Sequence, residues 1–218
     1  MTTTEEIAAS SYTPAELSYL LAGRQTPEAA RARQVLGLAE IFEGDPSILP
    51  SVQSLRARGL VTIGGEDDDT VELAQSTQAM GYVLGNANDW TRLAVATPDR
   101  VEALVVASAP GVPSALVLRA DRVGNYQAVA TKPETHPSQI VGMVVSGYLA
   151  QVDQVTVSIH RDKGDDARVL VAEASVSADQ FTVTRRSGLT GADDVADGET
   201  LVVDKATYLS NLETLLGE

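Results

Sequence analysis

Residues 90–108, WTRLAVATPDRVEALVVAS, decide the fold class of this chain. The hydrophobic period changes here from 3.6 to 2: Leu93 and Val95 are two residues apart in the run from Trp90 to Ala96, and a second, mostly apolar run follows from Val101 to Ser108. This two-residue period is typical of strands, and Pro98-Asp99-Arg100 between them supplies turn chemistry. The stretch therefore predicts an antiparallel hairpin.

The same pattern continues towards the C-terminal end. Further strands are predicted at 115–120 and 126–130, and the helical spacing of Ile140, Val144 and Tyr148 predicts a helix over 137–151. Strands are then predicted at 154–161, 168–175, 180–185 and 200–203, followed by a helix over 204–216. Residues 90–218 thus contain two successive runs, and each run consists of four strands followed by one helix. We expect an α+β fold in which an antiparallel sheet is built from two quasi-repeated ββββα units.

Residues 1–89 have mainly helical signals. Thr13-Pro14-Ala15-Glu16 is a capping box, and Thr26-Pro27-Glu28 opens a second helix with Val35, Leu38, Ala39 and Phe42 at helical spacing up to Gly44. A third helix is predicted from about residue 50 to Arg58, an extended piece over 60–63, and a fourth helix over 71–84. We expect an N-terminal helical region, 1–89, that packs on the sheet of 90–218 within one compact domain.

Composition restricts the possible functions. The chain has 218 residues, a formal net charge of −14 and no cysteine, which excludes disulfides, thiolate nucleophiles and cysteine-ligated metals. A strongly acidic chain is a poor partner for nucleic acid or anionic membranes. No signal-peptide pattern or apolar run of membrane-spanning length is present, so we expect a cytoplasmic protein.

Motifs for catalysis or cofactor binding are weak. The two histidines, His136 and His160, have no ligand-like spacing, and glycine-rich phosphate loops are not found. The acidic stretches Asp67–Asp69 and Asp193–Asp197 do not match a calcium loop, and we interpret both as solvated loops. We therefore predict no catalytic, cofactor-binding or metal-binding residues. Paired carboxylates of a hydrolase remain an alternative, because their separation is set in three dimensions.

One segment has some likeness to a DNA-binding motif. Three helices that end in SLRARGLV, residues 54–61, followed by a short strand, resemble a winged helix with Arg56 and Arg58 on the third helix. The next residues, 66–69, are acidic where a wing would approach phosphate. We accordingly predict no nucleic-acid partner.

The chain resembles the EspG family, which is associated with ESX, or type VII, secretion in actinobacteria. The likeness has three parts: residues 49–61, which end in LRARGLV; the strand block at 90–133; and residues 155–216, which contain VTVSIHRDKGDDARVL, QFTVTRR, TLVV and a leucine-rich end. Members of this family are cytosolic chaperones that bind the apolar tip of a PPE protein in a PE–PPE pair. The resemblance implies a non-enzymatic binding protein with a protein partner of this kind and no cofactor.

Binding of an apolar tip requires exposed apolar surface with a polar rim. The predicted contact residues are Pro110, Val112 and Pro113 in a loop and Leu209, Leu212 and Leu216 on the last helix. Two alternatives stay open beside the chaperone: a generic α+β interaction module or homodimer, and a carboxylate-dependent hydrolase.

Overall fold

The computed structural model describes most of the chain, and its fold is mixed α+β with antiparallel strand pairing. The described residues are 10–42, 44–64, 70–133, 135–149, 151, 154–163, 168–177, 180–189, 200–204, 206–208 and 210. They fall into two structural units. The first unit comprises Met1–Ala87, Ala109–Val112 and Ala120–Ala130, and the second comprises Asn88–Ser108, Pro113–Arg119 and Thr131–Glu218.

The first helix of the first unit begins where the capping box predicts it. Helix α1 spans Pro14–Leu20, and the Thr13 hydroxyl accepts a hydrogen bond of 3.2 Å from the Glu16 amide. The Glu16 carboxylate in turn accepts one of 2.8 Å from the Thr13 amide. Two amides that the helix itself cannot satisfy are thus both paired.

Helix α2 is shorter than its apolar spacing predicts. It spans Pro27–Leu36 and ends at Gly37, whose φ of 62° lies in the left-handed region. The predicted continuation of this helix to Phe42 is wrong, and Phe42 is exposed. Glycine adopts this left-handed conformation without a steric cost, so the helix ends at Gly37 and not at Gly44 as predicted.

Helix α3 spans Ile48–Ala57 and leads into a small hairpin of strands β2, Val61–Gly64, and β3, Thr70–Leu73. The predicted helix over 71–84 is therefore wrong at its start, because β3 pairs with β2 through Val71↔Ile63 and Leu73↔Val61. Helix α4 begins only at Gln75 and ends at Asn86. Val71 and Leu73 are two residues apart, which is strand spacing, but the prediction assigned both to the helix.

A strand pair in the first unit joins segments distant in sequence. Strand β1, Ser10–Tyr12, which was not predicted, pairs antiparallel with β7, Tyr126–Ala130, with Ser10 opposite Ala128. The Tyr126 hydroxyl also donates a hydrogen bond of 2.8 Å to the Leu36 carbonyl at the end of α2. Three residues carry too little pattern to predict a strand, so its existence depends on the partner strand.

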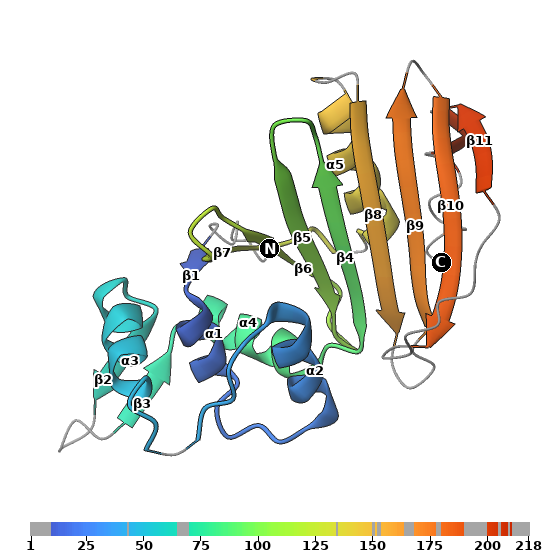
Figure 1. Ribbon diagram of the computed structural model, residues 1–218. Helices are drawn as coiled ribbons and strands as arrows, with labels where there is room; N and C mark the ends of the chain where they lie inside the picture. The colour runs from blue at the N-terminus through green and yellow to red at the C-terminus, as the bar shows by residue number, and fades with distance from the viewer. Residues whose placement is uncertain are drawn as a thin grey trace, which may run out of the picture. The chain divides into compact units, whose positions relative to one another are not determined.

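The second unit is a sheet of antiparallel neighbours (Figure 1). Its strands lie in the order β6-β5-β4-β8-β9-β10-β11. Their bounds are β4 Asp89–Ala96, β5 Val101–Ser108, β6 Leu116–Ala120, β8 Gln154–Lys163, β9 Arg168–Ser177, β10 Gln180–Leu189 and β11 Thr200–Asp204. The predicted strands are confirmed, and the prediction of an antiparallel α+β fold with them.

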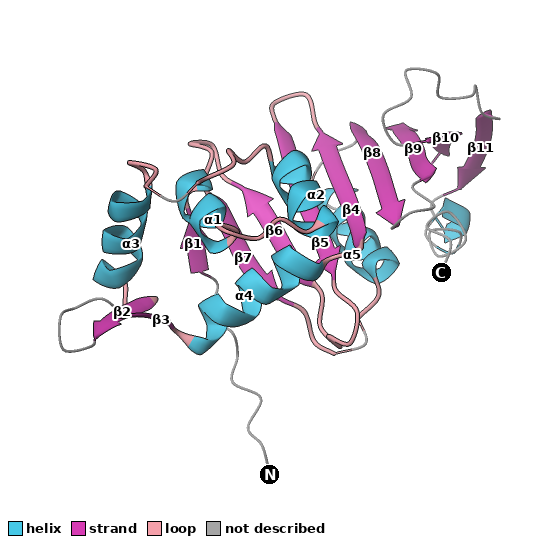
Figure 2. Cartoon of the chain, turned by 90° about the horizontal axis from the view of Figure 1, so that it is seen from below, coloured by secondary structure: helices cyan, strands magenta, loops and turns pink. Residues whose placement is uncertain are grey.

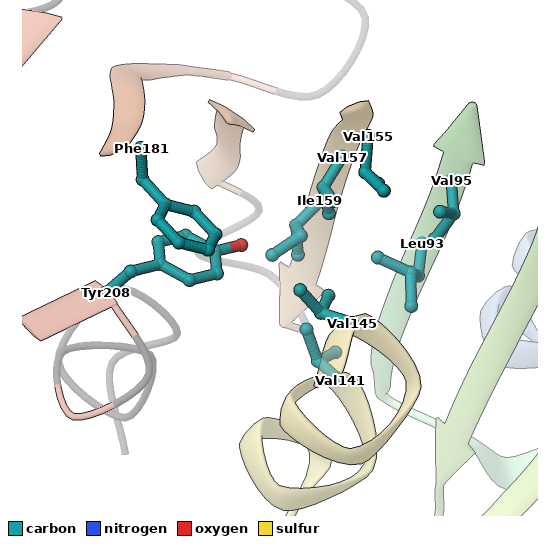
Figure 3. Packing of buried hydrophobic residues seen from close by; sticks show 9 residues of the cluster. All are labelled: Leu93, Val95, Val141, Val145, Val155, Val157, Ile159, Phe181 and Tyr208. Atoms are coloured by element: carbon teal, nitrogen blue, oxygen red, sulfur yellow. The ribbon is translucent and has the colours of Figure 1, made fainter. Parts of the chain in front are cut away.

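Helix α5, Pro137–Leu149, covers one face of β4 and β8 (Figure 2). The register places Leu93 opposite Ile159 and Val95 opposite Val157, so these four side chains share a face. Val141 and Val145 point from α5 onto them in one buried cluster (Figure 3). The cluster also contains Val155, Phe181 and Tyr208.

A buried ion pair links β4 and β8 near one end of this strand pair. The Arg161 guanidinium on β8 donates to both carboxylate oxygens of Asp89 on β4, at 3.0 and 2.5 Å, and both side chains are largely buried. Bidentate pairing satisfies the charge of each group where water has little access.

Candidate functional site

A pocket of about 340 Å³ lies in the second unit beside α5. Its lining residues come from β4, β5, β6 and α5, together with the residue before β5 and one after α5. They are Leu93, Val95, Arg100, Glu102, Ala103, Leu104, Arg119, Met143, Val144, Gly147, Tyr148 and Gln151. The pocket therefore combines an apolar part with a charged part.

Sheet register explains how these two parts arise. Leu93 on β4 is opposite Leu104 on β5, and Leu104 is opposite Arg119 on β6. Two residues further along β4, Val95 is opposite Glu102 on β5. Directly opposite residues share a face, so the apolar side chains and the charged ones lie next to each other on the face that α5 covers.

Helix α5 contributes one side of the pocket. Val144 and Tyr148 are four residues apart, so they lie one above the other, as do Met143 and Gly147. Met143 is 64% exposed, which is high for a large apolar side chain. Gly147 has no neighbouring atom within 4 Å of where a Cβ would stand, so the wall is open there.

Two arginines share one glutamate at the charged part, and we call Arg100, Glu102 and Arg119 the Arg–Glu–Arg cluster. The Glu102 carboxylate lies 3.1 Å from Arg100 and 2.6 Å from Arg119. Burial alone would raise the pKa of Glu102, but a hydrogen bond with Tyr148 and the charges of Arg119 and Arg100 outweigh it and lower the pKa. Glu102 is thus ionised at neutral pH, and the cluster has one excess positive charge.

Tyr148 joins the apolar wall to this cluster. The guanidinium carbon of Arg100 lies 5.4 Å from the centre of the Tyr148 ring, within the range of a cation–π contact. Burial raises the pKa of Tyr148, and its hydrogen bond with Glu102 adds to this effect. The tyrosine therefore stays neutral and serves as a hydrogen-bond donor to the carboxylate.

The arrangement is suited to binding. An apolar group fits against Leu93, Leu104 and Val144, while the adjacent guanidinium groups attract a negative charge. Within the described ranges, the structure contains no cluster of three or more His, Asp or Glu side chains that could hold a metal ion.

The predicted binding residues do not line this pocket. Pro110 and Pro113 are exposed and Val112 is half-buried, in a turn in which the Val112 amide donates to the Ala109 carbonyl at 3.2 Å. Leu209, Leu212 and Leu216 lie outside the described residues, as do Asp67–Asp69 and Asp193–Asp197. Sequence reasoning missed the pocket, although Glu102 inside an otherwise apolar strand was a signal.

The other residues singled out in the sequence are not among the pocket-lining residues. His136 is exposed before α5 and His160 is half-buried on β8. Arg58, from the winged-helix likeness, pairs with Glu16 and lies over the Tyr12 ring, 5.7 Å from its centre. No helix in the described part of the chain is both long enough and apolar enough to cross a membrane.

Comparison with known proteins adds no assignment to this geometry. No model of an established protein family matches the chain, and no curated protein matches it significantly.

Proposed function

We propose that this chain is a non-enzymatic binding protein that shields an apolar segment of a partner protein, similar to an EspG-like type VII secretion chaperone. The observation that carries the proposal is the pocket beside α5, whose apolar lining is bordered by the Arg–Glu–Arg cluster. Protein interfaces combine an apolar centre with a polar rim in the same way.

The size and exposure of the pocket favour a short segment as its occupant. About 340 Å³ is at the small end of ligand pockets, which span ~300–1,000 Å³. Met143 extends the apolar surface outwards from the pocket. An inserted apolar side chain would gain burial there against Leu93, Leu104 and Val144.

The finer architecture belongs to the same proposal. We propose that the sheet consists of two quasi-repeated ββββα units preceded by an N-terminal helical region. Strands β4 and β8, the first of each run, pair antiparallel, and later strands of each run lie progressively further out. Tyr208, from the helical residues 206–208 after β11, joins the same cluster as α5 and stacks on Phe181 at 4.7 Å. These features support the repeat that the EspG resemblance implies.

Residues predicted from the sequence extend the docking surface in this proposal. The turn with Pro110, Val112 and Pro113 would be a further contact for the partner, as would Leu209, Leu212 and Leu216. Such a chaperone would act in the cytosol, where it meets its partner before secretion.

Co-expression with PE–PPE pairs tests the proposal. We expect the chain to elute in a stable complex with one such pair, and we expect Met143→Glu to abolish the complex because it places a charge at the pocket. Leu49→Glu is the matched control, because Leu49 is 63% exposed in the first unit and is not part of the pocket lining.

Two results would contradict the proposal. One is a complex with a PE–PPE pair that Met143→Glu leaves intact, which would exclude the pocket as the docking site. The other is failure to bind any tested pair together with a doubled mass by light scattering, which would support a homodimer instead.

A further inference from the structure

We infer that the partner segment that enters this pocket carries a carboxylate beside its apolar side chains. This inference rests on the proposed function and adds the charge that the pocket selects. It follows from the composition of the Arg–Glu–Arg cluster, in which two guanidinium groups face one carboxylate.

The two arginines have capacity for a second acceptor. Their ion pairs with Glu102 are made through one terminal nitrogen of each guanidinium, Nη1 of Arg100 and Nη2 of Arg119. Each guanidinium has five N–H donors in a planar fork. The side chains of Arg100 and Arg119 are 45% and 52% exposed, so an incoming carboxylate reaches them without displacing Glu102.

The position of the cluster links charge selection to apolar binding. Arg119 is opposite Leu104, and Glu102 is opposite Val95, so the guanidinium groups border the apolar lining directly. A ligand with an apolar chain and a terminal carboxylate would contact both parts at once. A cationic ligand would meet the excess positive charge, and a neutral one would gain only the apolar contact.

Because the chain has a net charge of −14, its preference for a carboxylate acts only close to the Arg–Glu–Arg cluster. At long range the acidic chain repels anions, but at 0.15 M salt the screening length is about 8 Å. The arginines of the cluster therefore dominate the potential that a ligand experiences inside the pocket under these conditions.

Titration with three octyl compounds tests the inference: octanoate, octanamide and octylammonium, which share a chain and differ in head-group charge. The reporter is the methyl signal of Met143 in protein labelled with [¹³C-methyl]methionine. Met80, buried in α4 of the first unit, is the internal control for non-specific effects. We expect octanoate to shift the Met143 signal and to bind about two- to fivefold tighter than octanamide, the range of exposed ion pairs, with octylammonium weakest.

A charge variant and its control identify the source of the preference. Arg119→Gln should remove the octanoate advantage, because the remaining Arg100–Glu102 pair is neutral. Arg122→Gln, which removes an exposed arginine on the β6–β7 turn in the first unit, should leave the advantage unchanged.

The possible failures are distinguishable. Equal binding of octanoate and octanamide would overturn the charge inference and leave the apolar docking site standing. No Met143 shift with any of the three compounds would overturn the docking site itself. A fatty acid found bound to the purified protein by native mass spectrometry would overturn the assignment of a protein segment in favour of a lipid.

Discussion

Glu16 connects local and distant structure in the first unit. It closes the capping box of α1 and also accepts a hydrogen bond from Arg58, 42 residues later in the chain. Its carboxylate is almost fully buried. Burial alone would raise the pKa of Glu16, but hydrogen bonds from the Thr13 amide, Ser54 and Arg58, with the charge of Arg58, lower it below its ordinary value of 4.5.

This lowered pKa predicts how stability depends on pH. A carboxyl with a lower pKa in the folded state stabilises the fold above its unfolded pKa, and this contribution is lost as the pH falls through the folded value. Glu16→Gln keeps a residue type that closes a capping box but removes the charge. We expect wild type to be more stable than Glu16→Gln at pH 7 and this difference to shrink below pH 4.5, as measured by urea unfolding at pH 7 and pH 3.5. A difference that stays constant or grows on acidification would contradict the role of the charge.

At the scale of elements, glycines act oppositely at a helix end and inside a helix. Gly37 ends α2 with a positive φ, whereas Gly147 lies within α5 with open space where a Cβ would stand. Helical spacing alone did not distinguish these roles, which is why the sequence prediction extended α2 too far. The left-handed conformation at Gly37 costs other residues roughly 1–2 kcal/mol, while glycine inside a helix costs about 0.5–1 kcal/mol relative to alanine.

Alanine substitutions at these two glycines should therefore have opposite signs. We expect Gly37→Ala to lower the free energy of unfolding by about 1 kcal/mol. Gly147→Ala should raise it by about 0.5–1 kcal/mol. Urea midpoints at constant m-value provide the measurement. Stabilisation by Gly37→Ala, or destabilisation by Gly147→Ala, would show that backbone conformation does not control stability at these two positions.

Strand prediction succeeded where an apolar, β-branched run stood between turn residues and failed for two short strands next to helical signals. The runs at 90–96 and 101–108 stand between turn residues, and each is a strand in the structure. Strands β1 and β3 have three and four residues, too few to outweigh the helical signals next to them. The formation of β1 depends on pairing with β7, which lies far along the chain, and that of β3 on pairing with β2.

The whole molecule carries a formal net charge of −14, which acts on every part of the fold. Self-repulsion of like charges is stronger in the compact state than in the extended chain. Added salt screens this repulsion. It also weakens the exposed ion pairs of Arg100 and Arg119, but such pairs contribute little, and the buried Arg161–Asp89 pair is screened less.

We therefore expect the melting temperature to rise between 20 and 500 mM NaCl. For a chain of this length, a gain of about 1 kcal/mol corresponds to about 2–4 °C. Potassium chloride should act equally, because the effect depends on ionic strength. A melting temperature that falls with both salts would mean that attractive ion pairs outweigh the net repulsion.

Residues close together in the chain suffice to predict the strand runs and the capped start of α1, and composition alone gives the acidic charge. Tertiary structure alone decided that β4 lies against both β5 and β8, and that Arg100, Glu102 and Arg119 gather beside α5. Alternation specifies which side chains share a face of a strand, but it does not specify the neighbouring strand or its register. Those are set by burial of the joint apolar face under α5, to which distant segments contribute together.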